Sequence, residues 1–269
     1  MAFSAAGQQV SEPDVSERLS AWIDACTYRW QEVTKHLPED AAPRFPKGHY
    51  QLAYSILGNF PEPTLPQLRE LLTRAESHST GWPLFLMPYN AEEGPYPVDG
   101  AIEANLGASW KEARQHFLGP SHQDFWRVSP AGQAFSTRGF QEDEAERGGN
   151  LVLDLTIPIW RVGEGLLHAQ RLSQALEAED ADILFRVIYT GLKGRTLTSL
   201  SGNRVVFRKR TSQQERFENE VTVQAATVND LLPEIVLQLL EPLYASFDFF
   251  ELSDVLVQEE LRRMRKNRY

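Results

Sequence analysis

Residues 124–140 read DFWRVSPAGQAFSTRGF, and this stretch decides the fold. In its middle, Ser129-Pro130-Ala131-Gly132 has Ser first, Pro second and Gly last, the order that a type I turn prefers. A bulge at Gly132 lets Ser129 pair with Gln133 and predicts a β-hairpin. Counting outward from the turn pairs Val128 with Ala134, Trp126 with Ser136, and Asp124 with Arg138.

The segments around this hairpin contain both helix and strand patterns. Apolar residues at helical spacing predict a long helix over residues 12–37. Upstream of the hairpin we further expect a strand at 50–57, a helix at 65–76 capped by Thr64 and Gln67, a buried strand at 82–87, a loop at 88–97, and a strand at 101–106.

Downstream of the hairpin, the patterns end in a helical C-terminus. They predict an acidic surface loop at 141–150, strands at 151–155, 182–189, 205–208 and 220–224, and helices at 158–176, from 229 to a kink or end at Pro242, and at 253–265. This order is not regular βα alternation. We therefore predict an α+β fold with a mostly antiparallel sheet packed by helices.

The domain prediction follows from the same pass along the chain. Residues 1–10 are predicted to be a disordered lead-in, and residues 11–269 a single α+β domain. The only segment that resembles a subdomain boundary is 141–150.

Composition restricts the compartment and the partners. The chain has 269 residues, a formal net charge of −10 and one cysteine, Cys26, so it has no intramolecular disulfide. A single thiol fits a reducing compartment, and we predict a cytoplasmic protein. No apolar stretch approaches ~18 residues, so no membrane partner is expected.

Sequence motifs of the common enzyme classes are absent. The chain contains no phosphate-binding loop, no dinucleotide-binding glycine motif, no HExxH and no GxSxG. The sequence therefore does not decide whether the protein is an enzyme, names no cofactor, and predicts no metal site.

The densest polar and aromatic cluster is 121–127. His122 and Asp124 are two residues apart, so on a strand they share a face. One interpretation makes His122 a general base oriented by Asp124. The structural interpretation, which we favour, is that Asp124 and Arg138 form a cross-strand ion pair.

A second cluster covers residues 160–168. Glu164 and His168 are four residues apart on the predicted helix, which suits either a pair of metal ligands or a carboxylate that orients an imidazole. Gly163 and Gly165 each cost a helix about 1 kcal/mol relative to Ala, which indicates close approach of another group. Packing of the helix on its neighbours explains the same residues and is favoured.

Two basic segments interrupt the acidic chain. Residues 193–216 carry seven cations and one anion, and the C-terminus adds five more cations at 262, 263, 265, 266 and 268. Such segments predict a nucleic-acid surface at Arg204, Arg208, Lys209 and Arg210. A solvated strand face explains them as well.

Four strings of the sequence carry a family resemblance: 124-DFWR, 138-RGFQED, 157-IPIWRVGE and 231-LLPEIV. They resemble the C-terminal region of bacterial multidomain proteins known as AlbA-like, Schlafen-type DNA-binding or ATP-binding proteins, over residues 44–263. The resemblance implies a module without the AlbA-like domain, acting in bacterial regulation or phage defence, beside an effector domain. It implies no functional residues.

Two functional hypotheses follow. The first is a non-enzymatic module that senses a small ligand or binds a protein partner, using a cleft lined by Trp126, Arg127, Arg138, Trp160, Arg161 and Glu164. The alternative is a metal-assisted hydrolase or nuclease that acts on a phosphorylated or nucleic-acid substrate, using His122, Asp124, Glu164 and His168. A homo-oligomer formed through the C-terminal helices is a further option.

Overall fold

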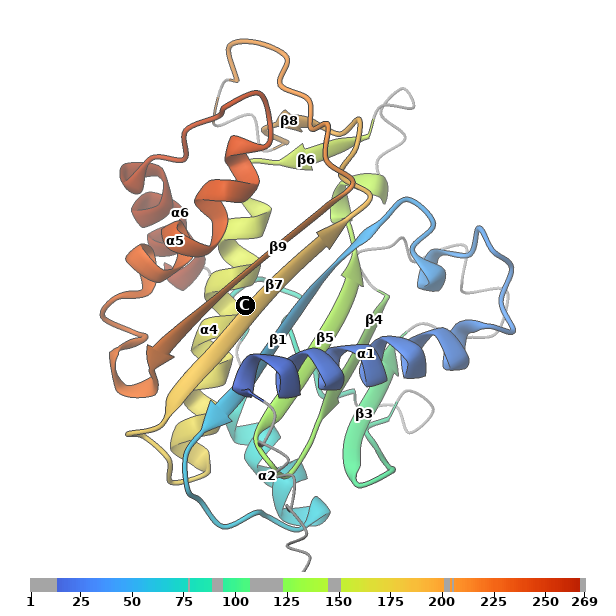
Figure 1. The fold of residues 1–269 in the computed structure, drawn as a ribbon, viewed down its shortest axis with the longest axis vertical. Helices are drawn as coiled ribbons and strands as arrows, with labels where there is room; N and C mark the ends of the chain where they lie inside the picture. Colours follow the sequence, from blue (N-terminus) through green and yellow to red (C-terminus); the bar gives the residue numbers. More distant parts are fainter. Residues whose placement is uncertain are drawn as a thin grey trace, which may run out of the picture.

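A seven-stranded antiparallel sheet forms the centre of the computed structural model, which describes residues 14–76, 78–88, 94–106, 123–144, 151–200, 204 and 206–266 (Figure 1). The order of the strands is β2-β3-β4-β5-β1-β7-β9. Their bounds are β1 His49–Leu57, β2 Tyr96–Val98, β3 Ala101–Leu106, β4 Asp124–Val128, β5 Gln133–Gly139, β7 Asp182–Thr190 and β9 Arg216–Gln224. The predicted α+β class with an antiparallel sheet is confirmed.

The hairpin that the turn predicts is formed by β4 and β5. The Ser129 backbone N–H donates to the Gln133 carbonyl at 2.9 Å, and Gly132 has a φ of 76°. The positive φ explains the glycine, because other residues rarely adopt it. The observed register confirms all three predicted cross-strand pairs: Val128 with Ala134, Trp126 with Ser136, and Asp124 with Arg138.

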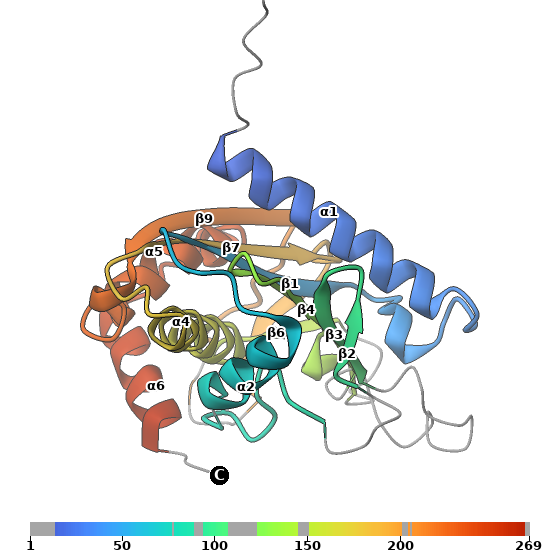
Figure 2. The ribbon, with the colours of Figure 1, turned by 90° about the horizontal axis from the view of Figure 1, so that it is seen from below.

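One long helix covers one face of the sheet, as Figure 2 shows. It is α1, Val15–Thr34, slightly shorter than the predicted 12–37. Its buried stripe of Leu19, Ile23, Cys26 and Trp30 packs on sheet residues such as Phe125 and Phe135. The predicted apolar spacing therefore does face the sheet.

The opposite face of the sheet is covered by the remaining helices of the described residues (Figures 1 and 2). They are α2 Leu65–Ala75, α4 Ile157–Ala175, α5 Leu232–Ala245 and α6 Asp254–Lys266. The capping box predicted for α2 is present, with the Gln67 side chain accepting from the Thr64 backbone N–H at 2.9 Å. Pro242 lies in the last turn of α5, which continues to Ala245.

The two glycines of α4 mark close packing, as expected. A Cβ at Gly163 would lie 2.6 Å from a methyl carbon of Leu261 on α6. A Cβ at Gly165 would lie 3.0 Å from the ring of Phe185 on β7. Glycine therefore lets α4 approach both its neighbour helix and the sheet.

Two predicted strands are wrong. Residues 82–87 form an irregular segment, because Pro83 lacks an N–H, Phe85 has a φ of 57°, and the backbone is bonded by distant side chains. The described residues 206–208 form no strand. A small parallel sheet instead joins β6, Val152–Asp154, to β8, Thr196–Thr198, which the sequence did not predict.

Three short 3-10 helices complete the described elements: η1 Ala42–Arg44, η3 Gln141–Glu144 and η4 Ala225–Thr227. The second corrects the predicted surface loop at 141–150. Glu142 is buried, with one carboxylate oxygen accepting from the Asp154 backbone N–H at 2.7 Å. Residues 145–150 lie outside the described part of the chain, as do residues 1–10.

The larger of the two hydrophobic clusters among the described residues spans most of the chain. It runs from Tyr50 to Met264 and joins residues from both sides of the 141–150 segment. None of the helices in the described ranges has the length and apolarity needed to span a bilayer.

Candidate functional site

Asp124 and Arg138 meet on adjacent strands beneath the irregular segment 80–85. Both side chains are buried, and the guanidinium binds the two carboxylate oxygens. Arg138 also donates to the carbonyls of Trp82 and Pro83 at 3.2 and 3.1 Å, and the Trp82 indole N–H donates to Asp124 at 2.7 Å. This ion pair therefore anchors the 80–85 segment to the sheet.

The helix α4 binds the same segment from the other side. Arg161 donates to the hydroxyl of Thr80 and to the carbonyl of Trp82, both at 2.6 Å. Glu164 accepts from the Thr80 hydroxyl at 2.8 Å and from the Leu84 backbone N–H at 3.3 Å. Because its carbonyls and N–H groups are bonded by these side chains, the segment stays ordered without belonging to a sheet.

His168 lies deeper in the same layer. Its Nδ1 is 2.8 Å from the hydroxyl of Tyr54, and the ring of Phe85 stacks on it with centroids 4.3 Å apart. Burial, helped by the positive charge of Arg171, lowers the pKa of His168 to about 3. Its Nε2 has no hydrogen-bond partner among the described residues. The imidazole is therefore neutral near pH 7 and closed to solvent.

Charge in this cluster is stabilised by pairing. Burial opposes the charge of the Arg138 guanidinium, but the charge and hydrogen bond of Asp124, together with Tyr50 and Glu164, outweigh burial, so the pKa of Arg138 rises above its usual value. Burial raises the pKa of Glu164, although the charge of Arg161 and the hydrogen bond from Thr80 partly offset this. Arg138 and Glu164 are thus both buried and bonded to charged or polar groups of the fold, as buried charges require.

The residues of the hydrolase hypothesis are only partly placed. Asp124, Glu164 and His168 lie in one layer between the sheet and α4, and all three are buried. His122 lies outside the described residues. In the described part of the chain, no group of three or more His, Cys, Asp or Glu side chains is arranged to hold a metal ion.

The six residues expected to line one cleft do not do so. Four of them are buried around segment 80–88: Trp126, whose indole donates to the Leu86 carbonyl at 2.9 Å, with Arg138, Arg161 and Glu164. Arg127 lies on the opposite face of the sheet beneath α1, over the ring of Trp22, because adjacent strand residues face opposite sides. Trp160 points to α6, where it donates to Glu260 at 3.2 Å.

The predicted nucleic-acid residues are mostly used within the molecule. Arg204 pairs with Glu259 and Glu260 of α6, and Arg210 donates to the Asp248 carbonyl at 2.6 Å. Arg208 and Lys209 are exposed. The structure thus leaves two of the four cations at the surface without a described ionic partner.

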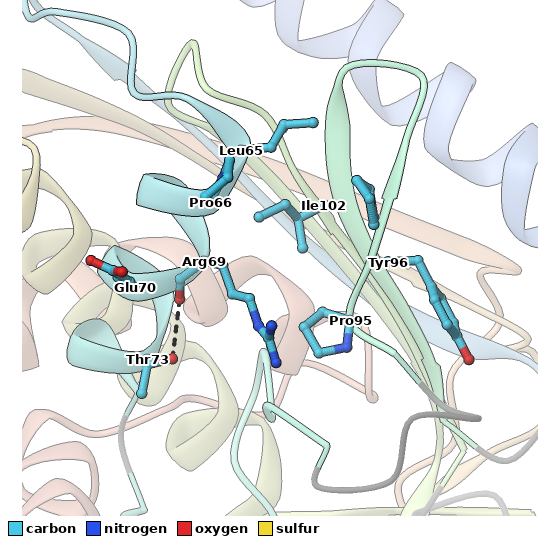
Figure 3. A pocket seen from close by; sticks show the side chains of 9 residues that line it. Leu65, Pro66, Arg69, Glu70, Thr73, Pro95, Tyr96 and Ile102 are labelled. Carbon is cyan, nitrogen blue, oxygen red and sulfur yellow. Dashed lines mark hydrogen bonds between the residues drawn. The ribbon is translucent and has the colours of Figure 1, made fainter.

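An open groove of about 730 Å³, which sequence reasoning missed, lies between α2 and the β2–β3 hairpin (Figure 3). On α2, the lining positions 65, 69 and 73 are four residues apart and form one stripe of the helix. On the hairpin, Pro97 pairs with Ile102, so both side chains share a face. The lining residues are Leu65, Pro66, Arg69, Glu70, Thr73, Pro95, Tyr96, Pro97 and Ile102.

One sequence signal for this groove was available. Asp99-Gly100 is a preferred two-residue hairpin turn, and both residues have positive φ angles, 47° and 73°. This turn predicts that residues 96–98 form a strand that pairs with 101–106. Residues 96 and 97 lie in the segment 88–97, for which we predict a loop. The position of α2 beside that hairpin is a long-range contact with no local signal.

No protein-family model, curated protein or solved structure matches this chain. The resemblance to the C-terminal region of AlbA-like, Schlafen-type proteins therefore stays a prediction. The geometry of the molecule itself carries the argument about function.

Proposed function

We propose that this chain is a non-enzymatic binding module that senses a small ligand in the groove between α2 and β2–β3 and also docks a protein partner. The groove is the observation that carries the proposal. Its volume of about 730 Å³ is within the range of ligand sites, roughly 300–1,000 Å³. Apolar walls with a few polar groups are also typical of such sites.

The buried cluster supports the same proposal by contrast. A catalytic acid, base or nucleophile must reach the substrate. Asp124, Glu164 and His168 are at most 2% exposed and contact partners inside the protein. The hydrolase alternative would need these groups to open, together with His122, and the present geometry favours binding over catalysis.

A separate surface supports the partner-binding half of the proposal. Phe207 and Phe249 are 96% and 89% exposed, on two segments joined by the bridge between Ser212 and Phe247. Large exposed aromatic side chains are enriched at protein interfaces. A nucleic-acid partner has less support here, because Arg204 and Arg210 are engaged in internal contacts.

The groove is tested by a ligand-observed NMR screen of small apolar fragments against the full chain. Thr73→Trp places a large ring over the groove from an exposed helix position, and Arg18→Trp on α1 is the matched control. We expect bound fragments to be lost from Thr73→Trp and retained by Arg18→Trp. Fragments that bind both variants equally, or no bound fragment at all, would overturn the proposal.

The biological role is proposed on the resemblance alone, the location on the single thiol, and the oligomeric state on the C-terminal helices. A bacterial regulatory or phage-defence role, a cytoplasmic location and a homo-oligomeric state all stay predictions. Partner binding at Phe207 and Phe249 is compatible with each of them, since it needs only an exposed aromatic surface.

A further inference from the structure

The walls of the groove are mostly apolar. Leu65 and Pro66 come from the first turn of α2, and Pro95, Pro97 and Ile102 come from the hairpin (Figure 3). Proline has no N–H, so Pro95 and Pro97 offer a ligand no backbone donor. The part of a ligand that contacts these walls must itself be apolar.

Among the described residues, one cation lines this apolar groove. The side chain of Arg69 extends from α2 toward Pro95, whereas the carboxylate of Glu70 points away from the centre of the groove (Figure 3). Glu70 also lines a second hollow on the other side of α2, together with Arg74. Among the described lining residues, the charge that faces the centre of the groove is therefore that of Arg69, in a protein whose formal net charge is −10.

The guanidinium of Arg69 is available for a ligand. It forms no hydrogen bond or ion pair with any residue in the described ranges, in contrast to the buried Arg138 and Arg161. Guanidinium groups bind carboxylates through two parallel N–H···O bonds. Such a contact is stronger beside an apolar wall than in open water.

The number of donors selects the kind of anion. A phosphate monoester carries nearly two charges and three acceptor oxygens. The hydroxyl on this stripe of α2, that of Thr73, already donates to the Arg69 carbonyl at 3.1 Å (Figure 3). One guanidinium matches a single carboxylate better than a phosphate.

We infer that the groove binds a ligand with an apolar body and one carboxylate, and that Arg69 holds the carboxylate. This inference rests on the proposed function, since it names the ligand class of the same groove. It adds the charge of the ligand and the residue that selects it.

The test compares two probes that differ only in charge. Binding of 4-phenylbutanoate and of its neutral amide, 4-phenylbutanamide, is measured by NMR titration of the full chain at low salt. We expect the acid to bind about tenfold tighter than the amide, as for other hydrogen bonds to a charged group. We expect this preference to shrink as salt is added.

Two variants show whether the preference for the acid comes from Arg69. Arg69→Gln should remove the preference for the acid, whereas Arg74→Gln, at an exposed arginine five residues further along α2, should keep it. Equal binding of acid and amide by the wild-type chain, or a preference that survives Arg69→Gln, would overturn the ligand class and leave the groove standing. If neither probe binds and the fragment screen is also empty, the proposed function fails as well.

Discussion

Two regions on the same side of the sheet use arginine in opposite ways. Beneath segment 80–85, Arg138 is 1% exposed and is held by Asp124 and two backbone carbonyls. In the groove beside α2, Arg69 is exposed and contacts no described ionic partner. A dense polar motif is therefore not by itself a binding or catalytic site, because a ligand must be able to reach the groups that bind it or react with it.

The largest expected effect comes from breaking the buried ion pair. Arg138→Met leaves the carboxylate of Asp124 buried without its cation, and we expect a loss of about 3–5 kcal/mol in the free energy of unfolding. Urea unfolding followed by circular dichroism at pH 7 measures it. The double variant Asp124→Asn/Arg138→Met should lose less than the single variant. A loss below about 1 kcal/mol for Arg138→Met would show that the pair does not anchor the segment.

The next largest effect is expected at Glu142, a buried carboxylate with only one of its two oxygens in a described hydrogen bond. Burial raises the pKa of Glu142 from 4.5 to about 7, and its second oxygen has no described hydrogen-bond partner. Between pH 4.5 and 7 the unfolded chain releases this proton and the folded chain keeps it, so this group lowers stability as pH rises.

Glu142→Gln should therefore be more stable than the wild-type chain at pH 8, by up to about 3 kcal/mol, and similar to it at pH 4. Chemical unfolding of both proteins at the two pH values gives the comparison. A difference that does not change with pH would mean that Glu142 titrates normally.

Local signals in the sequence predict much of the sheet. They predict little of the polar layer beneath segment 80–85 and little of the groove beside α2. The turn at 129–132 set the hairpin register, and hence the contact of Asp124 with Arg138, because a turn fixes its flanking strands. The apolar run 82–87 predicts a strand, but it forms an irregular segment. Its backbone is bound by the side chains at positions 138 and 164, which are distant in sequence, so no local pattern indicates them. The six-residue cleft included Trp126 and Arg127, which a strand must place on opposite faces.

A smaller effect is expected at the buried imidazole. His168→Phe keeps the stacking on Phe85 but leaves the hydroxyl of Tyr54 without its partner, at a cost of about 1–2 kcal/mol at pH 7. Because burial lowers the pKa of His168 from 6.5 to about 3, the wild-type chain loses stability as pH falls through this range. The cost of the substitution should thus shrink between pH 6.5 and pH 4. A constant cost would contradict a neutral, buried imidazole.

The smallest effect on stability is expected in the groove. Arg69→Gln removes an exposed side chain with no described ionic partner, so the free energy of unfolding should change by less than about 0.5 kcal/mol. Thermal unfolding of Arg69→Gln and Arg138→Met, measured in parallel, compares the stability contributions of the two arginines. A large loss for Arg69→Gln would indicate a structural role and remove it as a free ligand contact.

The most direct test of the account is a two-dimensional amide NMR titration of the assigned full chain with 4-phenylbutanoate. We expect shifts at the amides of Arg69, Thr73 and Ile102, which line the groove. We expect no shifts at Thr80, Leu84 and Glu164 in the buried cluster. Shifts confined to the buried cluster would contradict the account, because they would show that the ligand enters the polar layer instead of the groove.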